Sequence, residues 1–428
     1  MSKSLKLPFQ ALRGNALLGP AAALFISANI ANAANLIFNM IFARLMGPAA
    51  FADLTLLLTL KLGVLSFLGA FQFAFAELTA KEADVHKSRQ QAHAFSWQSL
   101  KFSIPAMFIV MALANYVSAS LNFSSPAALW VLALAIPFFF PMVIYRGLTQ
   151  GLIDLPKIIL SIQAEWLIRL LGSLILWQMG MGLPGIAAAV GLSILAGFYF
   201  STGKQTKSAA PADAPATLDQ DTKALGLVAL PYLILQVAQV LILDSDILLA
   251  KASFSSETAG LVAGLLLIQR VFFFAFLSCS TILQPLVAKQ QDAQRSPNEL
   301  LMLLGAITFV TACAMTIVIP SSDLIVRIML GEAYLALSSI VWISALTGAI
   351  FIGSHLCAIH QIAKGKSFAA MIILFFGFLQ LLSLSAVNHF FPDIGLQAYF
   401  SFKLLIQIAC AVTLLGIILT PLKSKQTR

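Results

Sequence analysis

The sequence predicts an all-α polytopic membrane protein with about twelve transmembrane helices. Only 10% of its 428 residues are charged, against about 25% in soluble domains, and 60% are hydrophobic, with a mean hydropathy of +0.92. The apolar residues also fall into runs that are long enough to cross a bilayer. A water-soluble fold of this length cannot hide so much apolar surface, so lipid must be the solvent.

The spans follow from length. A transmembrane helix needs roughly 20 apolar residues, because about 30 Å of hydrocarbon is crossed at about 1.5 Å per residue. Pro137 and Pro141 in the fourth run and Pro231 in the seventh predict kinks, since proline removes a backbone hydrogen bond. The predicted spans are residues 17–43, 52–78, 102–120, 127–147, 158–179, 184–202, 225–249, 260–287, 300–320, 339–360, 369–390 and 397–420.

The basic residues predict the orientation. With both termini in the cytoplasm, 19 of the 26 Lys and Arg residues fall on the cytoplasmic side, and only Arg44, Lys251 and Arg327 fall outside. The remaining four lie within spans. Cytoplasmic loops of membrane proteins are enriched in Lys and Arg. This bias accounts for the net charge of +9 without nucleic acid.

A polar stretch divides the chain. Residues 203–224 are rich in Ala, Pro, Asp and Lys, and they separate six predicted spans from the next six. We therefore expect an N-terminal lobe over 1–202, a cytoplasmic linker over 203–224 and a C-terminal lobe over 225–428. Six spans return the chain to its starting side, so the two lobes would have parallel topology. The longest external loop, about 321–338, is expected to be partly helical.

Four amides mark one face of the first span. At 100° per residue, Asn29, Asn32, Asn35 and Asn39 lie within an arc of about 120°. An unsatisfied polar group in hydrocarbon costs several kcal/mol, so this stripe must face protein or water. Hydrogen bonds between helices are one explanation. A water-filled cavity explains four amides in register better.

Four cations within the predicted spans also indicate a polar cavity. Lys61, Arg169 and Arg270 lie deep in their spans, and Lys403 lies nearer the external face of the twelfth. A charge at the centre of a span costs at least about 2.5–3.5 kcal/mol. Glu165 stands four residues before Arg169, in the order that favours an ion pair. The other three have no acidic residue near them in their own spans. An unpaired cation in a cavity suits an anionic ligand, and pairing between spans or a purely structural role is the alternative.

Two carboxylates also lie within a predicted span. Asp244 and Asp246 lie near the external end of the seventh span, about 200° apart on a helix. They fit either a structural role or the binding of a coupling cation. No His or Cys spacing typical of a metal site is present. The sequence predicts no catalytic residue, metal ligand or cofactor.

Several stretches resemble Wzx-type polysaccharide-export flippases of the MOP superfamily. These are Asn35 to Pro48 (NLIFNMIFARLMGP), Tyr145 to Gly151 (YRGLTQG) and Asp244 to Leu249 (DSDILL). The family's aromatic-Gly step is replaced here by Phe51-Ala52. The resemblance implies two six-helix bundles around a central cleft. It also implies transport of a polyprenyl-pyrophosphate-linked oligosaccharide across the bacterial cytoplasmic (inner) membrane by alternating access, for cell-surface polysaccharide such as O-antigen.

The resemblance also implies partners and roles. The expected partners are the lipid-linked oligosaccharide, membrane lipid and a polysaccharide polymerase, with H⁺ or Na⁺ as the coupling ion, bound at Asp244 or Asp246. Lys61, Arg270 and Arg169 are the candidate ligands for pyrophosphate, and the asparagine stripe is the candidate for sugar or water. Arg44 and Arg146 match family stretches but stand at span ends, where helix-end or headgroup contacts are expected.

Three alternatives stay open. A multidrug antiporter of the same superfamily shares the architecture, but cationic substrates favour unpaired carboxylates over a cation-rich interior. A lipid II flippase has similar chemistry but usually carries two further spans. A membrane polymerase or ligase would be an enzyme, and it tends to need a large external loop that this chain lacks.

Overall fold

The computed structural model describes residues 18–202, 215–277, 298–391 and 394–419, which are helical with short connections and contain no strand. The prediction of an all-α membrane protein is confirmed. The helices of the first half are α1 (Leu18–Lys81), α2 (Val85–Ser120), α3 (Pro126–Ala133), α4 (Ile136–Gly151), α5 (Leu155–Gln178) and α6 (Gly182–Thr202).

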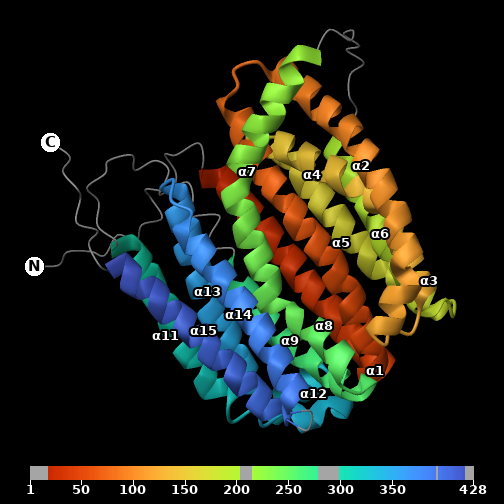
Figure 1. Cartoon of the computed structure of the whole chain (residues 1–428), viewed down its shortest axis with the longest axis vertical. Helices are drawn as coiled ribbons and strands as arrows, with labels where there is room; N and C mark the ends of the chain where they lie inside the picture. Colours follow the sequence, from red (N-terminus) through yellow and green to blue (C-terminus); the bar gives the residue numbers. More distant parts are fainter. Residues whose placement is uncertain (1–17, 203–214, 278–297, 392–393, 420–428) are drawn as a thin grey trace, which may run out of the picture.

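The second half continues the same pattern (Figure 1). Its helices are α7 (Pro215–Leu243), α8 (Ser245–Ser253), α9 (Ser256–Leu277), α11 (Asn298–Val318), α12 (Ser322–Met329), the 3₁₀ helix η2 (Glu332–Leu337), α13 (Val341–Ala363), α14 (Phe368–Phe390) and α15 (Leu396–Leu419). The external segment 321–338 is helical in part, as expected.

The first two predicted spans are the two limbs of α1, which meet at Gly47 (Figure 1). Its backbone has φ 71° and ψ 174°, a conformation that belongs almost entirely to glycine. The 64 residues of α1 would extend about 96 Å as a straight helix, three times the hydrocarbon thickness. The bend at Gly47 therefore lets one helix supply two crossings.

Ten helices of the described residues are long and apolar enough to cross a membrane, and α3 with α4 forms an eleventh span bent by 45°. Counting the limbs of α1 separately restores the twelve predicted crossings. The bend falls just before Pro137, which stands in the first turn of α4, so the kink predicted in the fourth span is confirmed.

Two boundaries in the middle of the chain differ from the prediction. The seventh span is not continuous over 225–249, because α7 ends at Leu243 and α8 begins at Ser245, with Asp244 between them. The proposed linker is partly helical, since α7 begins at Pro215. Residues 203–214 and the end of the predicted eighth span, 278–287, lie outside the described residues.

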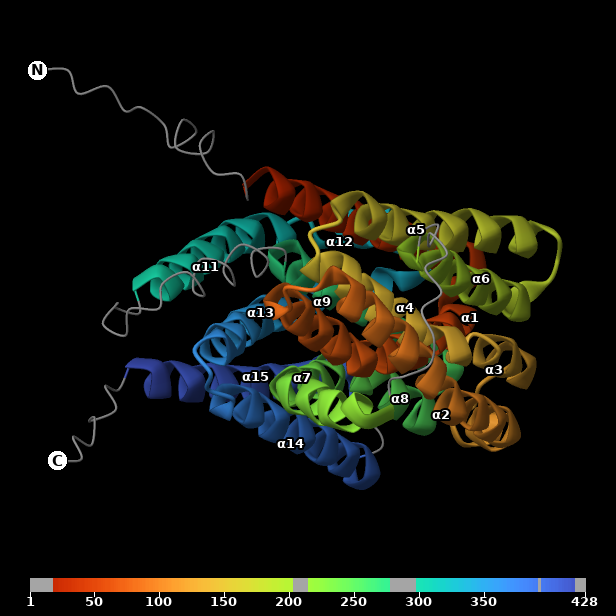
Figure 2. The ribbon, with the colours of Figure 1, turned by 90° about the horizontal axis from the view of Figure 1, so that it is seen from above.

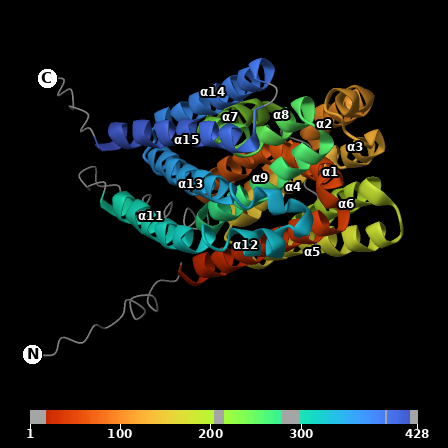
Figure 3. The same ribbon diagram turned by 90° about the horizontal axis from the view of Figure 1, so that it is seen from below.

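The helices from the two halves occupy opposite sides of the molecule, and α7 and α9 lie between them (Figures 2 and 3). We call helices α1–α6 the N-lobe and helices α7–α15 the C-lobe. The lobes meet on the side that holds Gly47, α8 and α12, which we call the Gly47 face. Away from this face, α7 also packs along the second limb of α1, where the ring centres of Phe73 and Tyr232 lie 5.6 Å apart. At the Gly47 face the largest hydrophobic cluster contains residues from both lobes, and the ring of Phe51 packs edge-on against Tyr334 at 6.3 Å. Gly260 lies so close to the Pro48 carbonyl that an added Cβ would come within 2.1 Å of its oxygen.

Candidate functional site

The N-lobe contains a buried cluster in which several cations surround one carboxylate. Lys61 of α1 and Arg146 of α4 each contact a different oxygen of Glu165 on α5, both at 2.9 Å. Arg146 also donates to the hydroxyl of Ser161 at 2.9 Å and to its carbonyl at 3.1 Å. Charge-assisted hydrogen bonds of this kind are among the strongest in proteins. Three helices are therefore fixed around Glu165.

Arg169 is the third cation of this cluster. One of its terminal nitrogens donates to the side-chain oxygen of Asn35 at 3.1 Å, and its guanidinium lies 5.6 Å from the centre of the Phe38 ring. Its Nε is buried without a hydrogen-bond partner among the described residues. The predicted pair between Glu165 and Arg169 is wrong in the described structure, because Glu165 pairs with Lys61 and Arg146 instead.

The asparagine stripe lies partly against this cluster. Asn35 bonds to Arg169 on α5, and Asn39, which is buried, donates to the Asn35 carbonyl at 2.7 Å. Asn29 and Asn32 are half-buried. Contacts within the protein, the simpler of the two explanations, therefore apply at least to Asn35 and Asn39. One turn beyond Asn32 toward the start of the helix, Ser27 accepts a hydrogen bond from Gln163 of α5.

The cations predicted to be unpaired in the C-lobe have partners. Arg270 binds Asp244 through two nitrogens and donates to the hydroxyl of Thr59 on α1 at 3.0 Å. Lys403 binds Asp246 and donates to Gln269 at 2.8 Å, and both charged side chains are fully buried. The expectation that Lys61, Arg270 and Lys403 stay unpaired for an anionic ligand is therefore wrong in the described structure, and the alternative of pairing between spans applies to all three. The partners come from other helices, which a single-span analysis does not see.

One buried pair was missed altogether. Lys251 of α8, assigned from sequence to the outer surface, is only 1% exposed and lies 2.7 Å from the carboxylate of Asp53 on α1. Its ammonium also donates to the Asn122 carbonyl at 2.6 Å, and the Asn122 amide donates back to the Lys251 carbonyl at 3.1 Å. This pair joins the two lobes at the Gly47 face. The sequence signal that could have found it is Asp53 itself, an acidic residue at the start of the second predicted span, 52–78.

The two arginines predicted at span ends behave differently. Arg44 donates to the carbonyl groups of Arg327 and Ile328 at the end of α12, so a helix-end contact is confirmed. Such a position suits a cation, because the C-terminus of a helix carries partial negative charge. Arg146 is buried within the N-lobe cluster, so the expectation of a helix-end or headgroup contact is wrong.

The balance of charge differs between these sites. Arg270 with Asp244, Lys403 with Asp246 and Lys251 with Asp53 each match one cation to one carboxylate. The N-lobe cluster has Lys61, Arg146 and Arg169 around Glu165 alone, which leaves an excess of two positive charges. Among the described residues, no group of three or more His, Cys, Asp or Glu side chains could hold a metal ion.

No protein-family model and no curated protein sequence matches the chain. Solved structures do. An inward-facing multidrug resistance MATE family transporter of the MOP superfamily shares 12% identity over 90% of this chain and 93% of that one, with a TM-score of 0.72. The eukaryotic MATE transporter AtDTX14 shares 13% identity over 94% of each chain, with a TM-score of 0.69.

A third similar structure is a MOP superfamily transporter from Pyrococcus furiosus, described by the reversed polarity of its binding pocket. It shares 14% identity over 97% of this chain and 98% of that one, with a TM-score of 0.65. At identities this low, the likeness concerns the fold. This chain therefore has the two-lobe helical fold found in MATE transporters of the MOP superfamily.

Proposed function

We propose that this chain is a transporter that carries a polyprenyl-pyrophosphate-linked oligosaccharide across the cytoplasmic membrane by alternating access. The observation that supports this substrate is the excess of two positive charges in the N-lobe cluster. A pyrophosphate diester carries two negative charges and would neutralise that excess. Burying ions without counter-charge is strongly unfavourable, so both the cluster and the ligand gain from binding.

Arg169 is the residue best placed to bind the ligand. It has no carboxylate partner in the described structure, and its Nε has a free donor. Its planar guanidinium presents donors that match phosphate oxygens, an advantage that a lysine does not share. Lys61 and Arg146 fix Glu165 and supply the remaining positive potential. Arg270, a predicted ligand, is neutralised by Asp244 and contributes less to an anion site.

Neighbouring polar groups extend the site. Asn32 and Asn29 lie about one and two turns from Asn35 on the same face of α1 and are only half-buried, so their amides can bond sugar hydroxyls. Asp244 and Asp246 remain the candidates for a coupling ion. Protonation of either would release a cation that is now paired, and this would tie proton binding to a change in the C-lobe.

A multidrug antiporter is the second candidate, because multidrug transporters share this fold. Cationic drugs need a site with excess negative charge, and the N-lobe cluster has the opposite sign. The neighbour from Pyrococcus furiosus shows that reversed pocket polarity occurs in this fold. The charge count therefore favours an anionic substrate.

The test is leaflet-resolved accumulation of undecaprenyl-linked glycan in a strain that lacks the gene. We expect glycan to be trapped on the cytoplasmic side and to be released by the wild-type chain but not by Arg169→Ala at equal expression. Lys157→Ala is the matched control, because it removes one cation from the surface of the same helix. Normal glycan delivery without the gene would overturn the flippase and favour the drug antiporter. Rescue by Arg169→Ala would support the flippase function but show that Arg169 is not needed to bind the substrate.

A further inference from the structure

Helix α5 has a lipid-facing side, and Trp166 does not lie on it. At 100° per residue, Trp166 points about 135° away from the centre of that side, and Arg169 points about 165° away. Both side chains are therefore directed into the protein, about 60° apart. The lipid-facing side is marked by the exposed large apolar side chains of this spanning helix, which are Leu160, Leu167, Leu171 and Ile175.

Trp166 lies between two contacts that join α5 to α1. On one side of it, Gln163 donates to the carbonyl of Ser27 at 3.1 Å and to its hydroxyl at 2.7 Å. On the other side, Arg169 donates to the side-chain oxygen of Asn35 at 3.1 Å. Trp166 is three residues from each donor, so its side chain lies against the part of α1 between the two contacts. The indole N–H donates to the side-chain oxygen of Gln163, which restricts the orientation of the ring.

The ring of Trp166 does not belong to the hydrophobic core. It is only half-buried, although it is directed into the protein. Within the described part of the chain it packs against none of the buried hydrophobic clusters, whereas Trp177, three turns further along α5, packs against the largest one. Tryptophans that anchor a span lie at the membrane interfaces, but Trp166 lies about 17 Å from the start of α5, near its middle. Part of the ring is therefore open toward the interior of the protein.

This position suits the sugar that is bonded to the pyrophosphate. Side chains three residues apart on a helix have Cβ atoms about 5–6 Å apart, so a ligand whose phosphate contacts Arg169 can place its first sugar beside Trp166. One face of a pyranose ring presents mainly C–H groups, which are attracted to the negative face of an aromatic ring. Asn32, half-buried in the facing part of α1, has an amide that donates to and accepts from hydroxyl groups.

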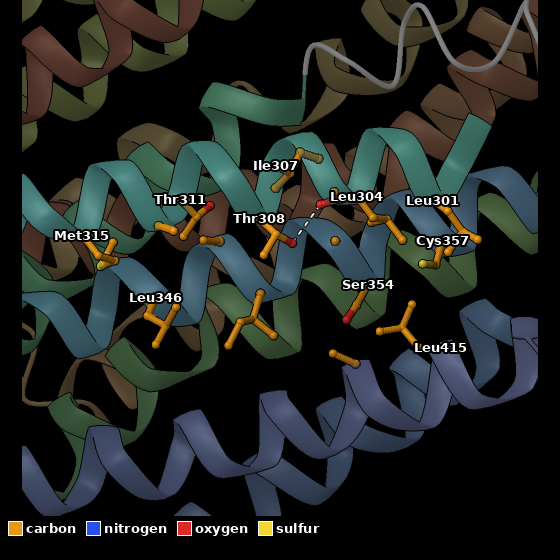
Figure 4. A pocket seen from close by; sticks show the side chains of 16 residues that line it. Leu301, Leu304, Ile307, Thr308, Thr311, Met315, Leu346, Ser354, Cys357 and Leu415 are labelled. Atoms are coloured by element: carbon orange, nitrogen blue, oxygen red, sulfur yellow. Dashed lines mark hydrogen bonds between the residues drawn. The ribbon is translucent and has the colours of Figure 1, made fainter. Parts of the chain in front are cut away.

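An apolar groove in the C-lobe, between α11, α13 and α15, shows the contrast (Figure 4). Its walls include Leu304, Leu346 and Leu415, and its polar groups include the hydroxyls of Thr308 and Ser354. The described lining holds no aromatic ring, amide or charged side chain. This groove therefore cannot stack on a sugar or neutralise a phosphate.

We propose that Trp166 is a specificity-determining residue that stacks on the first sugar of the transported lipid. The inference rests on the proposed function, since it names the part of the ligand that is recognised beside the pyrophosphate. Arg169 contacts the pyrophosphate, which the loaded and the sugar-free carrier lipids share, so it does not distinguish them. Trp166 contacts only the sugar and therefore favours the loaded lipid.

The test compares two probes, with the full chain in phospholipid nanodiscs. One is undecaprenyl pyrophosphate that carries a single hexose, and the other is undecaprenyl pyrophosphate itself. Binding is measured by titration. We expect Trp166→Leu to weaken binding of the hexose-bearing probe by about three- to tenfold, the size of an aromatic stacking interaction, and to leave binding of the sugar-free probe unchanged. Trp166→Phe keeps an aromatic face and should bind the hexose-bearing probe within about twofold of the wild type.

Trp177→Leu is the matched control, because it removes a tryptophan of the same helix that packs against the core. Its effect should be equal on both probes. A chain in which Trp166 is the only tryptophan tests the proposal without a change at that residue. Its fluorescence should change when the hexose-bearing probe is added and should not change with the sugar-free probe. This chain carries phenylalanine in place of Trp97, Trp130, Trp177 and Trp342.

Each contrary outcome has a distinct meaning. An equal loss of binding of both probes in Trp166→Leu shows a structural role and overturns the proposal. Unchanged binding of both probes in Trp166→Leu, while Arg169→Ala weakens both, overturns the sugar contact and leaves the proposed function standing. Failure of the wild-type chain to bind either probe defeats the sugar contact and the proposed function together.

Discussion

Loss of the ion pair between Asp53 and Lys251 should open the contact between the two lobes at the Gly47 face. The pair is 2.7 Å long, and its side chains are 6% and 1% exposed. Removal of one partner from a buried pair costs about 3–5 kcal/mol, because the other charge stays buried and unpaired. We therefore choose Lys251→Met, which keeps the length and apolar stem of the side chain and removes the ammonium.

The cost of leaving Asp53 buried and unpaired applies only to the conformation in which the lobes are closed at the Gly47 face. The alternating access that we propose requires the lobes to separate at this face, and water would then solvate Asp53. The variant therefore disfavours the closed arrangement relative to the open one by about 3–5 kcal/mol, or two to nearly four powers of ten in their ratio. At its upper end this shift approaches the roughly 5.5 kcal/mol that reverses a population of 99 to 1.

The assay is the distance between spin labels placed at Ser120 and Asp323, one exposed site on each lobe at the Gly47 face, in a cysteine-free background. We expect Lys251→Met to add a longer distance. The double variant Asp53→Asn with Lys251→Met should return toward the original distance, because no lone charge stays buried. Arg327→Met is the control, since its partner Glu332 is 81% exposed and surface pairs contribute only about 0–1 kcal/mol. An unchanged distance in Lys251→Met, with stability lowered as calculated, would refute the reasoning and leave the pair a purely structural element.

Three further outcomes are expected. Gly47→Ala should lower the free energy of unfolding by about 1–3 kcal/mol in thermal or denaturant unfolding, although its Cβ meets no atom, because φ of 71° is strained for alanine; an unchanged unfolding midpoint would contradict the strain. Arg169→Lys should bind a polyprenyl pyrophosphate at least about tenfold more weakly by titration, since one point charge replaces the forked donor, and equal affinity would show that charge alone matters. Gly151→Val should be more destabilising than Gly226→Val, because a Cβ at 151 would lie 2.6 Å from the Ala76 carbonyl oxygen while one at 226 meets nothing; equal stability of the two variants would show that α4 can move away from α1.

Hydropathy and the positions of the prolines were sufficient to predict most of the fold. Apolar length identified the crossings, because lipid requires every spanning backbone to be helical. Pro137 located the bend between α3 and α4. The break at Asp244 could not be predicted, since neither proline nor glycine stands there. That break also invalidates the angle of about 200° calculated between Asp244 and Asp246, because one helical phase does not continue from α7 into α8.

Pairing of the charges was the part that the sequence could not supply. A helical wheel shows which residues share a face, but it does not show which helix lies opposite. Lys403 and Asp246 are 157 residues apart, and Arg270 and Thr59 are 211 apart. The local pair of Glu165 with Arg169 had the correct spacing, yet pairs at that spacing contribute only about 0.2–0.5 kcal/mol. Two cations from other helices therefore compete successfully for the same carboxylate.

The distribution of the ion pairs bears on how such a molecule can move. The pairs of Asp244 and Asp246 lie within the C-lobe, where they stay intact if the lobe moves as a unit. The pair of Asp53 with Lys251 and the bond from Arg270 to Thr59 cross between the lobes and must break when the lobes separate. The N-lobe cluster crosses no such boundary, so its excess charge travels with one lobe through the whole motion. A ligand held by Arg169 would therefore keep its counter-charge while the lobes rearrange around it, which is the condition for carrying an anion through a low-dielectric interior.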